Sequence, residues 1–156
     1  MASITQPVAV VTAAEQTHPL GMTVGSFVSV SLDPQLVSVS LHNGSRTLAA
    51  ALATGRLGIS VLGADAAPIG AQFAARGRDR FAGIAWTMQA GLPRLTAAPT
   101  WISCRVAQAI PAGDHRIVLA AVQAVEHRPG ATLTYRDRTF GTHVPVTRPS
   151  TREGTR

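Results

Sequence analysis

The chain has 156 residues, which suits a single domain that buries about two-thirds of its unfolded surface. Hydrophobic residues make up 46% and aromatic residues 4%, which excludes a disordered chain and leaves Ala, Val and Leu to build the core. The net charge of +6 is carried by arginines alone, a composition that suits anionic ligands. Nucleic acid is not expected as a partner, because no basic segment is interleaved with aromatic residues.

Cysteine usage and the N-terminus indicate the compartment. A single cysteine, Cys104, excludes an internal disulfide and suits a reducing compartment. It lies within a predicted strand, so we interpret it as a buried, unreactive thiol. No stretch is long enough for a transmembrane helix, and the first residues lack the basic start and apolar core of a signal peptide. We therefore expect a cytoplasmic protein without a membrane partner.

The N-terminal part of the chain is predicted to form three strands. Val8 to Ala13 is apolar and β-branched, which is typical of a buried strand. Residues 15–20 contain a His-Pro pair and are predicted to form a turn. Residues 22–31 and 36–42 then alternate between apolar and small polar side chains, with a break at Asp33-Pro34.

Two helices are predicted next. Ser45 is a good N-cap for a helix that runs to Thr54 and stops at the following glycine. A strand over residues 57–62 separates it from the second helix. Asp65 is predicted to cap that helix, which extends through Ala75 and carries a proline in its first turn.

The C-terminal half is predicted to consist mainly of strands. Residues 91–99 form a loop or a short irregular strand, and the two longest strand candidates span 101–110 and 116–127. Residues 132–136 complete the set. Because strands come first, helices are inserted and strands return, the order favours a closed antiparallel barrel over a parallel doubly wound sheet. We expect one domain over 1–143 and a flexible Arg-, Pro- and Thr-rich tail over 144–156.

The first candidate site combines a glycine-containing segment with a helix N-terminus. Gly21 and Gly25 bracket a segment whose backbone N–H groups can approach a ligand closely. Ser45, Arg46 and Thr47 lie at the predicted helix N-terminus, where the dipole and free N–H groups favour a phosphate. The alternative is a hydroxyl-rich strand that faces solvent, followed by an ordinary helix cap. Spacing alone leaves both interpretations open.

The second candidate site is Gly113-Asp114-His115 at a turn between two strands. Glycine permits the bend, and Asp114 can hold the imidazole of His115 in one tautomer. The alternative is an ordinary hairpin turn whose Asp bonds its own backbone. The five histidines show no paired metal-ligand spacing, so no metal is expected. A Rossmann Gly-x-Gly-x-x-Gly motif is also missing, so a dedicated dinucleotide-binding domain is not expected.

The segment from Leu20 to Ser60 resembles the signature of the flavin reductase-like family, the small partners that supply reduced flavin to two-component monooxygenases. The matches continue through Asp79-Arg80-Phe81, Gly113-Asp114-His115 and Tyr135-Arg136, and cover roughly Val8 to Phe140. The resemblance implies a mainly β fold, the antiparallel FMN-binding split β-barrel with inserted helices. It also implies a homodimer.

The resemblance assigns roles to particular residues. The residues expected to line the isoalloxazine ring are Leu20, Gly21, Met22, Thr23, Ser26, Ser40, Leu41 and His42, and those expected at the phosphate are Ser45, Arg46 and Thr47. The expected cofactor-binding set is completed by Phe73, Arg80, Asp114, Tyr135 and Arg136. His115 is the expected catalytic residue, which orients the nicotinamide so that its C4 hydride lies beside flavin N5.

Three features depart from the family pattern. The chain starts almost at its first strand, so we expect the usual N-terminal helix to be missing. Gly25 stands where a serine is usual, and Asp137 stands where family members often carry glycine. The missing helix would remove part of the wall around the flavin and alter dimer packing. Gly25 would remove one hydroxyl contact with the flavin.

We therefore expect an NAD(P)H:flavin oxidoreductase that reduces FMN or FAD and supplies the reduced flavin to a separate oxygenase. NADH or NADPH would be the hydride donor. One alternative is a flavin- or small-molecule-binding split barrel without reductase turnover, motivated by the missing helix and by Gly25. Another is a flavin-dependent oxidative tailoring enzyme that acts on its own substrate. The sequence does not choose between FMN and FAD, or between NADH and NADPH.

Overall fold

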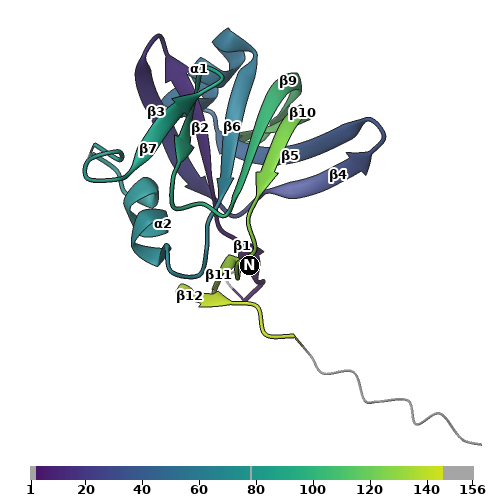
Figure 1. The fold of residues 1–156 in the computed structure, drawn as a ribbon. Coiled ribbons are helices and arrows are strands. Elements are labelled where there is room, and N and C mark those ends of the chain that lie inside the picture. The colour runs from purple at the N-terminus through teal and green to yellow at the C-terminus, as the bar shows by residue number, and fades with distance from the viewer. Residues whose placement is uncertain (1–2, 78, 146–156) are drawn as a thin grey trace, which may run out of the picture.

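The computed structural model describes residues 3–77 and 79–145, so most of the expected tail lies outside the described residues. The described chain is built mainly of antiparallel strands (Figure 1). In chain order, its elements are β1 Gln6–Pro7, β2 Ala9–Glu15, β3 His18–Val24, β4 Val28–Leu32, β5 Gln35–His42, α1 Arg46–Thr54, β6 Arg56–Val61, α2 Ala67–Ala74, β7 Trp86–Gln89, β8 Leu92–Leu95, β9 Thr100–Ala112, β10 His115–His127, β11 Leu133–Arg136 and β12 Thr139–Thr142.

The main sheet has seven strands in the order β3-β2-β6-β9-β10-β5-β4. Because β3 and β4 lie at its two edges without pairing, the sheet does not close. The closed barrel predicted from the element order is therefore wrong, and the open arrangement is the split barrel that the resemblance implies. Between β3 and β4, Ser26 Oγ accepts from Ser40 N at 2.8 Å and donates to Ser40 O at 3.2 Å. These backbone groups of β5 are therefore bonded to a side chain and not to a neighbouring strand.

Two smaller sheets complete the fold. β1, β11 and β12 form a three-stranded sheet below the main one in Figure 1, and β7 pairs with β8. In residues 3–8 the described chain has strand β1 and no helix. The predicted strands over 101–110, 116–127 and 132–136 are confirmed as β9, β10 and β11, and the loop or short strand predicted over 91–99 contains the strand β8. The strands β1, β7 and β12 were not predicted.

Two predictions in the N-terminal part are wrong in detail. The turn predicted over 15–20 is only two residues long, because Glu15 already pairs with His18 in the β2–β3 ladder. Pro19 follows His18 within β3. A proline is tolerated there because β3 is an edge strand of the sheet. The strand predicted over 22–31 is two strands, since the chain bends at residues 25–27 between β3 and β4.

The first helix follows the prediction and the second does not. α1 has Ser45 as its N-cap and Gly55, at φ 68°, as its C-cap. α2 is capped by Ala66 without a side-chain hydrogen bond, so the prediction that Asp65 caps it is wrong. α2 begins after Ala66 with a proline in its first turn, which places Asp65 one residue outside the cap. Neither helix in the described chain is long and apolar enough to cross a membrane.

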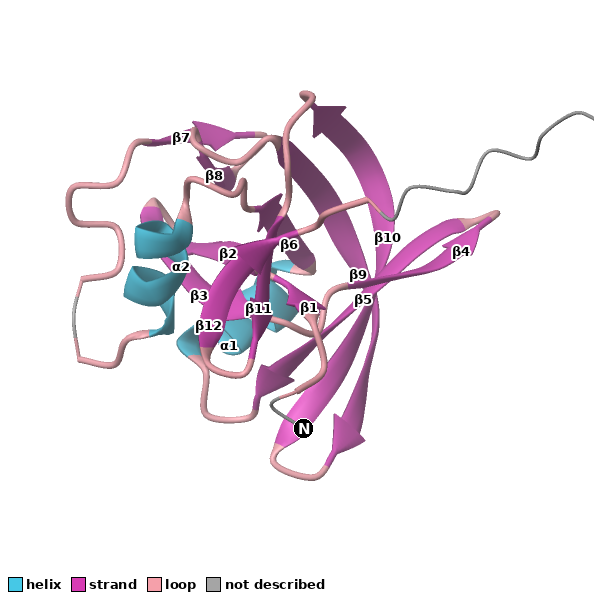
Figure 2. Cartoon of the chain, turned by 90° about the horizontal axis from the view of Figure 1, so that it is seen from below, coloured by secondary structure: helices cyan, strands magenta, loops and turns pink. Residues whose placement is uncertain are grey.

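Both faces of β2 are buried, which explains its continuous apolar sequence. Val11 belongs to a core cluster with Leu41 and Leu48, beneath α1. Val10 belongs to a second cluster with Phe73 and Phe81, beneath α2. Val10 and Val11 are neighbours in β2 and point to opposite faces of the strand, so the two helices cover opposite faces of β2. The β4–β5 hairpin projects away from both helices (Figure 2).

Candidate functional site

Gly21 of β3 lies directly over the aromatic core of α2. An ideal Cβ at Gly21 would be 2.8 Å from Phe73 Cε1, and Phe73 itself is fully buried. Arg80 Nη1 donates to Gly21 O at 2.7 Å, and Arg80 Nε donates to Ala75 O at 3.0 Å. Burial lowers the pKa of Arg80, and the guanidinium stays charged at neutral pH. Arg80 thus fastens the loop after α2 to the strand that is predicted to carry the flavin ring.

Thr23 and Ser26, predicted at the flavin ring, both have protein partners for their hydroxyl groups. Thr23 Oγ1 donates to Gly70 O of α2 at 2.7 Å, and Ser26 Oγ bridges to the Ser40 backbone as described above. Each hydroxyl oxygen keeps lone pairs, but its proton is already donated within the protein. These two side chains therefore fix the shape of the surface formed by β3 and β5.

The N-terminus of α1 is joined to β3. Ser45 Oγ accepts from Leu48 N at 3.3 Å and donates to Met22 Sδ at 3.1 Å. Thr47 is buried, and Arg46 forms an exposed salt bridge with Glu15 at 2.8 Å. Within the described chain, the N–H groups of Arg46 and Thr47 have no hydrogen-bond acceptor, as expected in a first helical turn. This terminus has the free donors and the dipole that a phosphate requires.

His42 and His115 face each other where β5 pairs with β10. They are partners in the strand register, and their ring centroids are 5.5 Å apart with the planes at 85°. His115 Nδ1 lies 2.6 Å from Asp114 Oδ1, and this hydrogen bond is the main cause that lowers the pKa of Asp114. Asp114 therefore stays ionised and accepts the Nδ1 proton, which leaves Nε2 of His115 available to a ligand.

Tyr135 and Arg136 lie in β11, in the small sheet rather than beside His115. Tyr135 packs on Phe140 with ring centroids 5.0 Å apart, and Arg136 Nε lies 3.3 Å from Asp137 Oδ2. An ideal Cβ at Gly70 would be 3.4 Å from Phe140, which places the β12 ring beside the helix turn that binds Thr23. No described contact joins Tyr135 to the two histidines.

The structure thus separates the predicted site residues into groups. One group is brought together at the ends of β5 and β10, the start of α1 and the middle of β3, and it includes Met22, Ser40, His42, Ser45, Arg46, Asp114 and His115. Leu41, Thr47 and Phe73 are buried behind it, and Leu20 is half-buried in β3. Tyr135 and Arg136 form the separate group. Direct contact of each residue with a cofactor stays a prediction.

Sequence reasoning missed residues that support the site. Asn43 N donates to Asp114 O at 2.9 Å, and Asn43 Nδ2 donates to Gly113 O at 3.1 Å. The signal was present, since Asn43 follows His42 at a strand end, but its partners are about seventy residues away. Gln6 was also missed, and its side chain covers the Cα of Gly25.

No group of three or more His, Cys, Asp or Glu side chains in the described residues is arranged to hold a metal ion. The donor set instead suits a planar, anionic cofactor. Thr23 and Ser26 fix the backbone of β3 and β5, and the α1 N-terminus provides donors for a phosphate. A flavin nucleotide fits both parts of this arrangement.

Comparison with known proteins finds relatives that are named as flavin reductases or flavin nucleotide oxidoreductases. The chain is 40% identical over 158 residues to an NADH:riboflavin 5′-phosphate oxidoreductase from Streptomyces pristinaespiralis, a match that covers 94% of this chain and 86% of that one. It is 38% identical over 122 residues to a longer protein from Rhizobium meliloti named "Probable flavin reductase", covering 77% of this chain and 39% of that one.

Solved structures show the same fold. The styrene monooxygenase flavin reductase from Pseudomonas putida S12 superposes with a TM-score of 0.85 at 34% identity, covering 93% of this chain and 95% of that one. The NADH:FAD oxidoreductase SgcE6 from Streptomyces globisporus C-1027, in complex with NAD and FAD fragments, superposes with a TM-score of 0.86 at 27% identity, covering 92% and 88%. The family model described as "Flavin reductase like domain" matches residues 1–143. The chain belongs to this flavin reductase-like family.

Proposed function

We propose that this protein is an NADH-dependent flavin reductase that passes reduced FMN or FAD to a separate oxygenase. The observation that carries the proposal is the meeting of β3, the α1 N-terminus and the His115–Asp114 pair at one end of the β5–β10 ladder. Family membership and the NADH-dependent relatives support the reaction type. A cytoplasmic location belongs to the same proposal and is supported by the single, buried cysteine.

The flavin would lie on β3 and β5 with its phosphate at the start of α1. When bound, it accepts a hydride at N5 from nicotinamide C4, which yields NAD⁺ and reduced flavin. Ser26 and Arg80 hold the backbone of β5 and β3 in place, so the surface is formed before the ligand binds. The N–H groups of Arg46 and Thr47 would donate to the phosphate.

His115 would orient the nicotinamide against the flavin ring. Its Nδ1 proton is bonded to Asp114, so Nε2 is the nitrogen that can accept a hydrogen bond from a carboxamide. Hydride transfer requires close approach and alignment of the two rings rather than a proton from the protein. This is why we assign His115 an orienting role.

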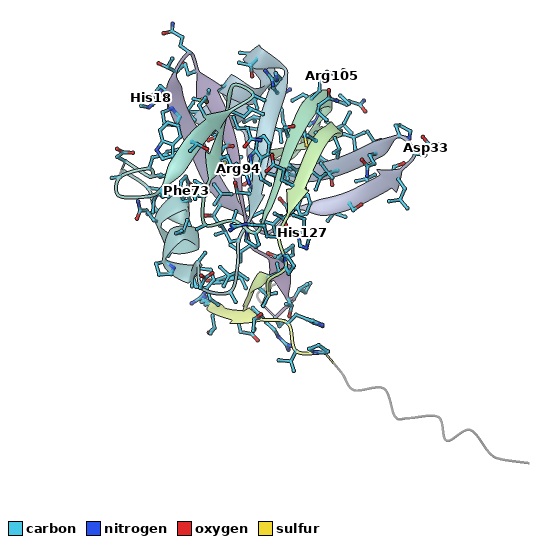
Figure 3. The ribbon with its side chains drawn as sticks, in the orientation of Figure 1. His18, Asp33, Phe73, Arg94, Arg105 and His127 are labelled. Atoms are coloured by element: carbon cyan, nitrogen blue, oxygen red, sulfur yellow. The ribbon has the colours of Figure 1, made fainter. Side chains whose placement is uncertain are left out.

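The test is NADH consumption by the purified protein under air, with FMN and then FAD added in excess. We expect oxidation that rises with added flavin and saturates, as for a flavin that is a diffusible substrate. His115→Ala is expected to lower kcat/KM for NADH by about 10-fold or more, with flavin affinity unchanged. His127→Ala is the matched control, because His127 lies at the opposite end of β10 (Figure 3).

Two outcomes would contradict the proposal. Flavin binding without NADH oxidation would favour a binding protein without turnover. Oxidation that depends on a further organic substrate would favour a tailoring enzyme.

We further propose that the protein is a homodimer that pairs through the β4–β5 hairpin. Val28, Val30 and Leu32 on β4 are 55%, 52% and 84% exposed, an unusual density of apolar side chains on a strand at a sheet edge. The tip of the hairpin at Asp33 lies well away from Phe73 and Arg94 in the body of the molecule (Figure 3). A second copy of the chain would cover this surface.

Light scattering after size exclusion tests the homodimer. The wild-type protein is expected to have twice the mass of the chain, and the double variant Val30→Asp/Leu32→Asp is expected to be monomeric. Val125→Asp, which places a carboxylate at an exposed valine of β10, is the control and should remain dimeric. A wild-type protein that is monomeric at high concentration would overturn this part of the proposal.

A further inference from the structure

The two histidines at the end of the β5–β10 ladder are held differently. Gly44 N donates to Nδ1 of His42 at 3.0 Å, so this nitrogen of His42 carries no proton. Nδ1 of His115 carries its proton toward Asp114, at 2.6 Å. His42 therefore has its ring fixed by the backbone of its own strand end, whereas His115 is fixed by a neighbouring side chain.

The bond to Asp114 alone does not fix the ring of His115. The side chain of Asp114 is 79% exposed and that of His115 is 42% exposed, so water competes for both groups. The only described ring that contacts His115 is His42, which meets it edge to face. The ring of His42 is thus the described packing contact of the His115 ring.

The turn that carries His115 is also fastened to the segment that carries His42. Both the backbone and the side chain of Asn43 donate to carbonyl groups of the turn, those of Asp114 and Gly113. Residues 42–44 therefore act together. His42 contacts the imidazole of His115, Asn43 holds the turn, and Gly44 fixes the ring of His42.

We propose that His42 is a positioning residue that holds the imidazole of His115 in the orientation required for the nicotinamide. The proposal rests on the function proposed above, in which His115 orients the nicotinamide. It differs from the role that the family resemblance implies for His42, which is contact with the flavin ring. A positioning role predicts that an aromatic ring at position 42 is needed, and that Nδ1 of His42 matters only because the bond from Gly44 N helps to hold that ring.

The kinetic experiment compares His42→Ala with His42→Phe in single-turnover reduction of FMN by NADH and by NADH deuterated at C4. His42→Ala is expected to slow hydride transfer by about 10-fold and to increase the deuterium isotope effect, because alignment is lost while FMN affinity is retained. His42→Phe is expected to restore most of the rate, because phenylalanine supplies the same edge-to-face contact. His127→Ala should behave as wild type.

Two kinetic results would overturn the proposal. If His42→Phe is as slow as His42→Ala, the imidazole nitrogens are needed and the ring contact is not the function. If His42→Ala weakens FMN binding and leaves the isotope effect unchanged, His42 is a flavin contact instead.

A measurement without nucleotides separates this proposal from the proposed function. Imidazole ¹⁵N spectra of the wild-type protein should show His115 in the Nδ1–H tautomer and His42 in the Nε2–H tautomer. In His42→Ala the His115 nitrogens should shift toward the averaged values of a freely rotating imidazole, and in His42→Phe they should not. Unchanged His115 signals in His42→Ala would refute positioning, whatever the enzyme's activity.

Discussion

Gly21 illustrates how a single residue shapes the candidate site. Its missing side chain lets β3 lie against Phe73 and Phe81, whose rings would be 2.8 Å and 3.3 Å from a Cβ at this position. Both rings are buried, so neither can move aside freely. The close approach also brings the Gly21 carbonyl within reach of Arg80.

Gly21→Ala is therefore expected to destabilise the protein by about 1–3 kcal/mol through overpacking. Urea unfolding measures the effect. Gly130→Ala is the matched control, because an added Cβ there has ordinary contacts with Pro99 at 3.6 Å and more. Equal stability of the two variants would show that the Phe73 ring is not held as described.

Cys104 is a residue whose behaviour follows from burial. The side chain is 1% exposed in β9, and burial raises the pKa of the thiol to about 12. Because the thiolate is the reactive form, a thiol reagent at pH 8 should label the native protein very slowly. Labelling should become rapid in urea, and rapid labelling without denaturant would contradict the buried position.

The hydroxyl groups of the predicted flavin wall show the limit of residue-level prediction. The alternating pattern of the sequence predicts the strand that carries Thr23, whereas Ser26 lies in the bend between β3 and β4. The pattern does not predict their partners, because Thr23 donates to a carbonyl 47 residues away and Ser26 bridges to a strand 14 residues away. Long-range pairing of this kind has no signal in a single sequence.

At the scale of elements, the β7–β8 hairpin depends on contacts beyond its own sequence. Arg94 Nη1 donates to Gln89 Oε1 and to Glu126 Oε2, both at 2.6 Å, and its guanidinium lies 5.5 Å from the centre of the Trp101 ring. These contacts fasten the hairpin to β9 and β10. The hairpin was not predicted as such because its strands are four residues long and its anchor, Glu126, lies 32 residues from Arg94 in the sequence. The capped helix α1, by contrast, carries its own start and stop signals and was predicted in full.

Glu126 gives this anchor a pH dependence. The hydrogen bonds from Gln89 and then from Arg94 lower the pKa of Glu126 below its ordinary value. A carboxylate with a lowered pKa in the folded state stabilises the fold above its unfolded pKa of about 4.3, and this stabilisation is lost as the pH falls through the folded pKa.

We therefore expect Glu126→Gln to be less stable than wild type at neutral pH, with a difference that shrinks as the pH falls below about 4. Urea midpoints at a series of pH values measure it. A difference that does not change with pH would show that the ionised form of Glu126 does not stabilise the hairpin.

At the scale of the whole molecule, an open sheet determines where the site and the exposed apolar surface lie. The sequence order of the elements predicted an antiparallel β fold with two packed helices. It could not predict that the sheet stays open, since the pairing of strands far apart in the sequence has no signal in the order of the elements. The opening leaves β4 as an exposed apolar edge, and the other end of the β5–β10 ladder gathers β3, α1 and the two histidines.

A reductase that supplies a separate oxygenase, as proposed above, must reduce flavin and then release it. The most direct measurement is anaerobic mixing of the protein with NADH and a large excess of FMN, while the loss of oxidised flavin absorbance is followed. We expect many equivalents of FMN to be reduced per protein chain, at a rate that His115→Ala lowers and His127→Ala does not. Reduction that stops at one equivalent, or does not occur, would contradict it.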